Sequence, residues 1–155
     1  MNSCTNDEEF VSAINDLFNE QIPFNKILGL KVESISYEHA NVSLQMREEL
    51  MGHSKRQMLH GGAISTIIDV AGGLAAYLGV QKKIPDGSVA ARIERFGKVS
   101  TIDMRVDYLR PGIGKWFVAT GSVLRTGKKI AVTRIELHND QNDLIAVGTG
   151  SYVVA

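Results

Sequence analysis

The pattern of apolar and polar residues predicts one long buried helix at the centre of the chain. Residues 61–78 form the most apolar segment and contain a single charged side chain, Asp69. Helices that are apolar on nearly all sides are buried inside a fold. At about 1.5 Å per residue this helix spans roughly 27 Å, so we expect it to follow the long axis of a domain.

Alternation of apolar and polar residues predicts the strands around this helix. Residues 40–46 alternate strictly, and the stretch 30–38 before them is the expected partner strand. Four further strands are expected at 101–108, 116–125, 130–138 and 144–154. Short turns between successive strands favour an antiparallel meander, with Trp116 in the core. About six strands and one long helix predict an α+β fold in which a curled antiparallel sheet wraps around the helix.

The remaining segments are expected to be a short helix and two loops. Apolar residues recur at helical spacing over 10–18, and Pro23 is expected to end this amphipathic helix. The polar residues 47–58 and the basic stretch 79–98 are expected to be loops, the second with a helical turn near 89–96.

Length and charge narrow the class of protein. The 155 residues suffice for one domain with a sizeable core, which we place at 23–155 after an N-terminal tail and short helix over 1–22. The 17 Lys and Arg balance the 17 Asp and Glu, so no net charge attracts nucleic acid or an anionic membrane. A phosphate-bearing ligand would need a local patch of cations.

The N-terminal residues and the cysteine content bear on location. Cys4 is the single cysteine, which excludes an intrachain disulfide and a cysteine zinc cluster and fits a reducing compartment. The first nine residues have neither the basic nor the apolar region of a signal peptide. The uncharged run after Asp69 is shorter than the about 20 residues of a membrane span. We therefore expect a cytoplasmic protein without a membrane span.

The start of the predicted helix, residues 60–62, has the sequence His-Gly-Gly. Glycines at a helix start expose backbone N–H groups, and the helix dipole adds partial positive charge there. Such an end can polarise a carbonyl or hold an oxyanion. A lone buried carboxylate such as Asp69 costs several kcal/mol unless it is compensated, so we interpret this segment as the active-site helix.

The spacing of the glycines and the carboxylate predicts a dimer. Asp69 lies eight residues beyond Gly61, which is about 80° around the helix and about 12 Å along it. One helix therefore cannot bring both groups to the same carbonyl carbon. A two-fold pairing of helices can, because the Gly61 end of one chain then approaches Asp69 of the other. We expect a homodimer with sites at the interface, and whether dimers pair into a tetramer is left open.

Two motifs together carry a resemblance to a known family. The His-Gly-Gly motif with an aspartate nine residues after the histidine, and the Val-Asp-Tyr-Leu-Arg-Pro-Gly segment at 106–112, resemble the PaaI-like branch of the hotdog-fold acyl-CoA thioesterases. Within this branch the run from Thr101 to Gly112 is most similar to the bacterial YigI-like thioesterases. The order of predicted elements from 23 to 154 also matches.

The resemblance implies a role for each residue of the motifs. Asp69 would act as general base or nucleophile towards the thioester carbonyl. Gly61, with or without Gly62, would polarise the thioester oxygen through backbone N–H groups, and His60 would shape the turn and donate or accept a hydrogen bond near the site. Relatives often carry an asparagine shortly before this histidine, and His53 is the candidate for that position here. Thr101 matches a position where some relatives use serine to orient the nucleophilic water.

The resemblance also implies substrate and partners. The chain would hydrolyse acyl-CoA, with a medium to long acyl chain, to a free fatty acid and coenzyme A without a cofactor, and we expect no metal. The cations expected to bind the coenzyme A phosphates are Arg110, Arg125, Lys128 and Lys129. Two alternatives stay open: a hotdog acyl-thioester hydratase or dehydratase, and a non-catalytic acyl-CoA binding module.

Overall fold

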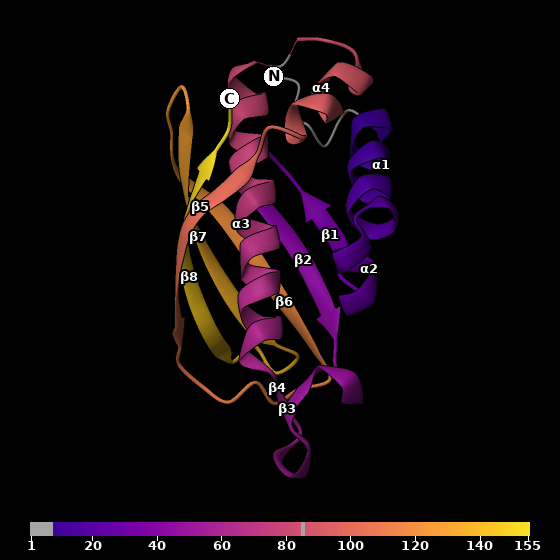
Figure 1. Ribbon diagram of the computed structural model, residues 1–155, viewed down its shortest axis with the longest axis vertical. Coiled ribbons are helices and arrows are strands. Elements are labelled where there is room, and N and C mark those ends of the chain that lie inside the picture. Colours follow the sequence, from indigo (N-terminus) through magenta and orange to yellow (C-terminus); the bar gives the residue numbers. More distant parts are fainter. Residues whose placement is uncertain (1–7, 85) are drawn as a thin grey trace.

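A six-stranded antiparallel sheet curls around one long helix in the computed structural model, which describes residues 8–84 and 86–155 (Figure 1). Cys4 lies outside the described residues. Across the sheet the strands lie in the order β1 (Lys31–Ile35), β2 (His39–Gln45), β6 (Trp116–Thr126), β7 (Ile130–Asn139), β8 (Leu144–Val153) and β5 (Ser100–Tyr108). The predicted α+β fold is confirmed, and it is the hotdog arrangement of a sheet wrapped around a central helix.

The central helix, α3 (Gly61–Lys83), is the core of the fold. By length and composition it is the one helix among the described residues that could cross a membrane, but 72% of its most apolar window is buried inside the fold. The helix continues five residues past the predicted end at Leu78. The glycine that follows, Gly79, permits close packing instead of ending the helix, because a Cβ there would lie 2.8 Å from Thr126 and 2.9 Å from Val123.

The sheet confirms the local strand pairings and corrects the predicted meander. β1 pairs with β2 as expected, and β6, β7 and β8 follow one another across the sheet. β5, however, pairs with the outer side of β8 and not with β6. The turn lengths on which the meander was predicted describe only neighbouring segments, whereas the position of β5 depends on contacts between residues far apart in the chain.

Short helices and one small hairpin complete the fold. Helix α1 (Glu8–Asp16) continues into a π-helical turn (Leu17–Gln21) and is followed by α2 (Pro23–Leu28), while α4 (Val89–Phe96) lies where a helical turn was predicted. The expected loop at 47–58 contains two 3-10 turns (Glu48–Leu50 and Ser54–Arg56) and the hairpin of β3 (Met51–His53) with β4 (Met58–Leu59).

The N-terminal helices pack on the same core as the sheet. Phe10 and Ile14 are fully buried, and Phe18 is nearly so, within the main hydrophobic cluster. Pro23 does not simply stop the helix: it occupies the first turn of α2, where the missing N–H and the fixed φ of proline are tolerated. The core therefore continues without a break across the predicted boundary between residues 22 and 23.

Trp116 does not lie in the core. It is the first residue of β6 and is 43% exposed, and it lines a polar groove on the outer face of the sheet. The next residue, Phe117, takes the core position and is fully buried. Adjacent residues of a strand point to opposite faces, so the aromatic character of Trp116 was a poor guide to its position.

Gly121 of β6 marks the closest approach of the sheet to α3. A Cβ at this position would lie 2.9 Å from the carbonyl carbon of Ala71, and the backbone of a buried helix cannot move aside. Gly121→Val should therefore lower the free energy of unfolding by about 3 kcal/mol. Chemical denaturation measures this change, with Ser122→Val on the half-buried neighbouring position as control. Equal stability of the two variants would contradict this packing.

Candidate active site

Two hydroxyl groups hold the side chain of Asp69. The Thr101 hydroxyl donates a hydrogen bond of 2.9 Å to Asp69 Oδ1. The Tyr152 hydroxyl lies 3.2 Å from the same oxygen and 3.2 Å from the carbonyl oxygen of Asp69. Among the described residues no donor reaches the second carboxylate oxygen, Oδ2. One carboxylate oxygen is thus anchored while the other is available to a substrate or to water.

The sheet places both hydroxyl groups at Asp69. Thr101 and Tyr152 are directly paired across β5 and β8. Tyr152 is 1% exposed, and burial, followed by the nearby charge of Asp69, raises the pKa of its hydroxyl. The hydroxyl therefore stays protonated at neutral pH and acts as a donor. Sequence reasoning missed Tyr152, although the alternation of β8 places it on the core side.

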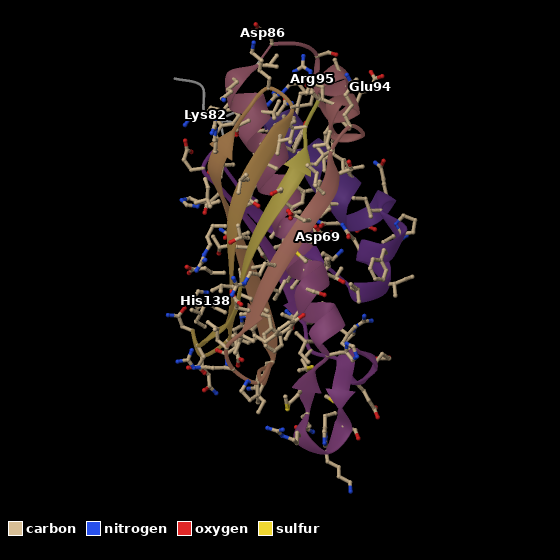
Figure 2. All side chains as sticks on the ribbon, turned by 60° about the vertical axis from the view of Figure 1, so that its left-hand side comes forward. Asp69, Lys82, Asp86, Glu94, Arg95 and His138 are labelled. Atoms are coloured by element: carbon tan, nitrogen blue, oxygen red, sulfur yellow. The ribbon has the colours of Figure 1, made fainter. Side chains whose placement is uncertain are left out.

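Asp69 borders a small, mostly apolar cavity of about 160 Å³. Polar groups come from Asp69, Thr101, Tyr152, Ser100 and Asn25. The apolar lining comes from the π-helical turn and the residue after it, from α3, and from the end of α4 and the segment after it: Phe18, Ile22, Val70, Gly73, Leu74, Phe96 and Val99. Figure 2 shows Asp69 at mid-height beside β5. A carboxylate with one free oxygen beside an apolar cavity can act as general base or nucleophile on a bound apolar substrate.

The start of α3 forms a second candidate group. His60 is the N-cap, and its Nδ1 accepts the N–H of Gly62 at 2.8 Å. The Gly62 N–H is therefore already used. The N–H of Gly61 has no acceptor among the described residues, while the carbonyl oxygen of Gly61 accepts the Tyr108 hydroxyl at 3.1 Å. This leaves Gly61 as the donor that can meet a carbonyl oxygen at the positive end of the helix.

One chain does not bring these two groups together. His60 and Gly62 line a cavity of about 420 Å³ together with Phe24, Leu28 and Thr66, and this cavity shares no lining residue with the one at Asp69. α3 confirms the predicted helix between Gly61 and Asp69, so the two groups are about 12 Å apart along its axis.

His53 lies near the start of α3 but lines neither cavity. It ends β3 and is exposed, and its Nδ1 accepts the backbone N–H of Arg56 at 3.3 Å. The preceding residue, Gly52, packs on His60, because a Cβ there would lie 3.1 Å from the Cα of His60. The β3–β4 hairpin is thus tied to the helix start, with the His53 side chain at its surface.

The predicted patch of cations is divided between two ends of the molecule. Lys128 and Lys129 form the turn after β6, and the carbonyl of Lys129 accepts the N–H of Val154 just after β8. Arg110 instead donates to the carbonyl of Leu144 at the first residue of β8. A strand of ten residues separates these ends by about 30 Å. Within one chain Arg110 therefore does not lie beside the lysines, whereas Arg125, Lys128 and Lys129 line one surface cavity of about 530 Å³.

The fold and the motif residues place the chain in a known class. The sequence profile of the thioesterase superfamily matches residues 57–146, which include the helix start, Asp69, Thr101 and most of the sheet. The chain belongs to this superfamily, and it is an enzyme of the thioester hydrolase class.

Individual relatives cover nearly the whole chain. It is 39% identical over 150 residues, 95% of both chains, to the Escherichia coli K12 protein named medium/long-chain acyl-CoA thioesterase YigI, and equally identical to the protein of that name from Salmonella typhimurium. A crystal structure related to the thioesterase superfamily, from Shewanella oneidensis, has a TM-score of 0.89 at 41% identity and covers 96% of this chain and 97% of its own. A structure from Syntrophus aciditrophicus has a TM-score of 0.87 at 50% identity, with coverage of 97% and 99%.

Proposed function

We propose that the protein hydrolyses medium- to long-chain acyl-CoA thioesters to a carboxylic acid and coenzyme A in the cytoplasm. The observation that carries the proposal is the state of Asp69: two hydroxyls hold Oδ1, and Oδ2 is available beside an apolar cavity. The relatives named medium/long-chain acyl-CoA thioesterase support the substrate class. The apolar lining of the cavity suits an acyl chain better than a small polar acid.

The reaction follows from the two groups of the site. Acting as general base, Asp69 takes a proton from water, and the resulting hydroxide forms a bond with the thioester carbonyl carbon. The carbonyl oxygen gains negative charge, which the N–H of Gly61 stabilises at the helix start. The carbon–sulfur bond then breaks, and the thiolate of coenzyme A takes up the proton from Asp69. Direct attack by Oδ2, followed by hydrolysis of the anhydride, is the other route open to the same carboxylate.

The free edge of β5 supports a dimer in which two chains build each site. β5 is the last strand of the sheet and pairs only with β8. Its backbone edge is nine residues long, and Ile102 and Tyr108 are 50% and 54% exposed. Long edge strands with exposed apolar residues pair readily with another chain. A second copy of β5 is the complementary strand for this edge.

Antiparallel pairing of two β5 strands would bring the separate groups together. On β5, Thr101 is hydrogen-bonded to Asp69 and Tyr108 is hydrogen-bonded to Gly61. These two residues therefore show where Asp69 and Gly61 lie along the strand. β5 carries one extra residue between Thr101 and Asp103, so Thr101 and Tyr108 point to the same face of the sheet. A two-fold axis at Arg105 then places Thr101 opposite Tyr108 of the second copy. Asp69 of one chain would then face Gly61 of the other, which supports the two-chain site.

Cations at the β6–β7 turn are our candidates for the coenzyme A phosphates. Arg125, Lys128 and Lys129 are exposed and line one surface cavity with Ile130 and Val132. No ion pair to them forms among the described residues. Phosphates are favoured where several cations gather, and the apolar residues of the same cavity offer contact for the adenine ring.

Thr101→Val should lower kcat for acyl-CoA hydrolysis by about 10- to 100-fold, because a hydrogen bond to a charged group contributes about 1.5–3 kcal/mol. Valine keeps the shape of threonine but cannot hold Oδ1. Thr101→Ser retains the hydroxyl and should keep most of the activity. Steady-state kinetics of the two variants measures this contrast, and equal kcat values would show that the hydroxyl does not orient Asp69.

Release of free thiol from a series of acyl-CoAs tests the proposed function. The protein should release coenzyme A from medium- and long-chain substrates. Consumption of enoyl-CoA without thiol release would show a hydratase instead. Binding of acyl-CoA without any release would show a binding module, and either result would overturn the proposal.

A further inference from the structure

The cavity beside Asp69 is too small for the acyl chain that the proposed function requires. Its volume is about 160 Å³, and at about 30 Å³ for each group of the size of water it holds about five such groups. A methylene group is of similar size, and medium and long acyl chains carry more than five of them. A longer chain therefore extends beyond this cavity.

Two phenylalanines from different helices form part of that lining. Phe18, from the π-helical turn after α1, and Phe96, at the end of α4, have ring centroids 4.8 Å apart. The Phe96 ring also meets Tyr77 of α3 edge-on at 5.5 Å. Tyr77 lines a different cavity, so Phe96 lines the first cavity and contacts a residue that lines the second.

The second cavity is three times larger and adjoins the first. It has a volume of about 480 Å³ and lies between the C-terminal end of α3 and the β6–β7 turn. Val99 lines both cavities. The larger one has further apolar walls from Val80, Ile84 and Val154.

Two of the cations around this second cavity are already engaged by backbone carbonyls. Lys83 donates to the carbonyl of Thr126, and Arg95 donates to those of Ile84 and Asp86 at 3.0 and 2.9 Å. Figure 2 shows Arg95 and Asp86 together at this end of the molecule. With their charges engaged, the aliphatic stems of Lys83 and Arg95 add to the apolar walls. Lys98 and Lys128 also line this cavity, and Lys128 lines the surface cavity proposed for the phosphates as well. The part that suits a hydrocarbon chain is therefore the apolar wall of Val80, Val99 and Val154.

We propose that Phe96 and Val99 set the acyl-chain length, by separating the Asp69 cavity from a second chamber that receives the far end of long chains. Short chains end at the Phe96 ring. Longer chains continue past it along Tyr77 and Val80. This inference rests on the proposed function, because it assigns the acyl chain of the substrate to the two cavities.

Phe96→Ala tests the inference by removing the ring between the cavities. The ratio of kcat/KM for hexadecanoyl-CoA to that for butanoyl-CoA should rise about tenfold or more, since each methylene that a pocket gains is worth at least about that factor. Val80→Phe, which fills the second chamber, should lower the same ratio. Leu124→Ala, on an exposed side chain that lines neither cavity, is the control and should leave the ratio unchanged. Thermal unfolding of each variant verifies that it is folded, and Phe96→Leu is the milder replacement if alanine is not tolerated.

Calorimetric binding of free carboxylates, from butanoate to hexadecanoate, separates this inference from the proposed function. If the wild-type protein hydrolyses no acyl-CoA but Phe96→Ala binds the longer acids more tightly, the proposed function fails and the two-chamber inference stands. If hydrolysis is observed and both Phe96 variants keep the wild-type chain-length profile, the inference is wrong. A uniform rise in KM for all chain lengths in Val80→Phe would also overturn it, because that result assigns the chamber to the nucleotide end of coenzyme A.

Discussion

Asp69→Asn should lower kcat for acyl-CoA hydrolysis by about 10²- to 10⁴-fold, the range for loss of a general base. Asparagine has nearly the same shape as aspartate, and its amide oxygen can still accept from Thr101 and Tyr152. It cannot take a proton from water or attack the carbonyl carbon. The loss should therefore appear in kcat, while the melting temperature stays close to that of the wild type. Thiol release under saturating substrate measures the change.

A second acidic variant shows whether the loss is specific to this site. Asp86 lies in the exposed loop before α4, and among the described residues only its backbone carbonyl accepts a hydrogen bond, from Arg95. Asp86→Asn removes the same charge as Asp69→Asn and should retain wild-type kcat. If a folded Asp69→Asn protein kept full activity, Asp69 would not take part in the mechanism, and another residue would be the catalytic group.

Combining an Asp69→Asn chain and a Gly61→Pro chain in one dimer should restore activity if each site uses two chains. Gly61→Pro removes the one N–H that is proposed to bind the oxyanion, and loss of such a donor costs about 10²- to 10³-fold in kcat. Proline is favoured at the first helical position, and His60 before it has the extended backbone, φ −62° and ψ 138°, that precedes proline. A Cβ at residue 61 meets the Tyr108 ring only at 3.5 Å, so the helix should form normally.

Co-expression of Asp69→Asn and Gly61→Pro chains with different affinity tags gives the heterodimer for this test. One of its two sites would carry both substitutions and the other neither, so the heterodimer should show about half of the wild-type kcat per dimer. Gly61→Ala, which keeps the N–H, should lose less activity than Gly61→Pro in the homodimer. A purified heterodimer as inactive as its parents would place each site within one chain and overturn the proposed β5 pairing.

Much of the fold was predictable because its signals are local. The apolar run around Asp69 predicted α3, since a helix without a polar face is stable only when buried. The strict alternation at 40–46 predicted β2, whose Ala40, Val42 and Leu44 are buried. Boundaries were less predictable: α3 passes Gly79 because Val123 and Thr126 of β6 pack closely against that residue, which no neighbouring residue reveals.

The candidate site was predictable only in part. The motif led to Asp69, Gly61 and Thr101, but gave no sign of Tyr152, which lies 83 residues from Asp69 in the chain. The choice of cations for the phosphates, made from residue type, also grouped Arg110 with Lys128, although within one chain they lie at opposite ends of β8. Residue type alone indicates which side chains can bind a phosphate, whereas strand pairing decides which of them are neighbours.

The sequence by itself determined the central helix, the motif at the start of that helix, the carboxylate within it, and the strands. These features follow from periodicity and short spacings, which depend only on residues close together in the chain. Only the tertiary structure decided that β5 is an edge strand of the sheet, that two hydroxyls from paired strands hold Asp69, and that Val99 lines both a small cavity and a large one. These features depend on contacts between distant segments, which form when the sheet curls around α3 and buries both.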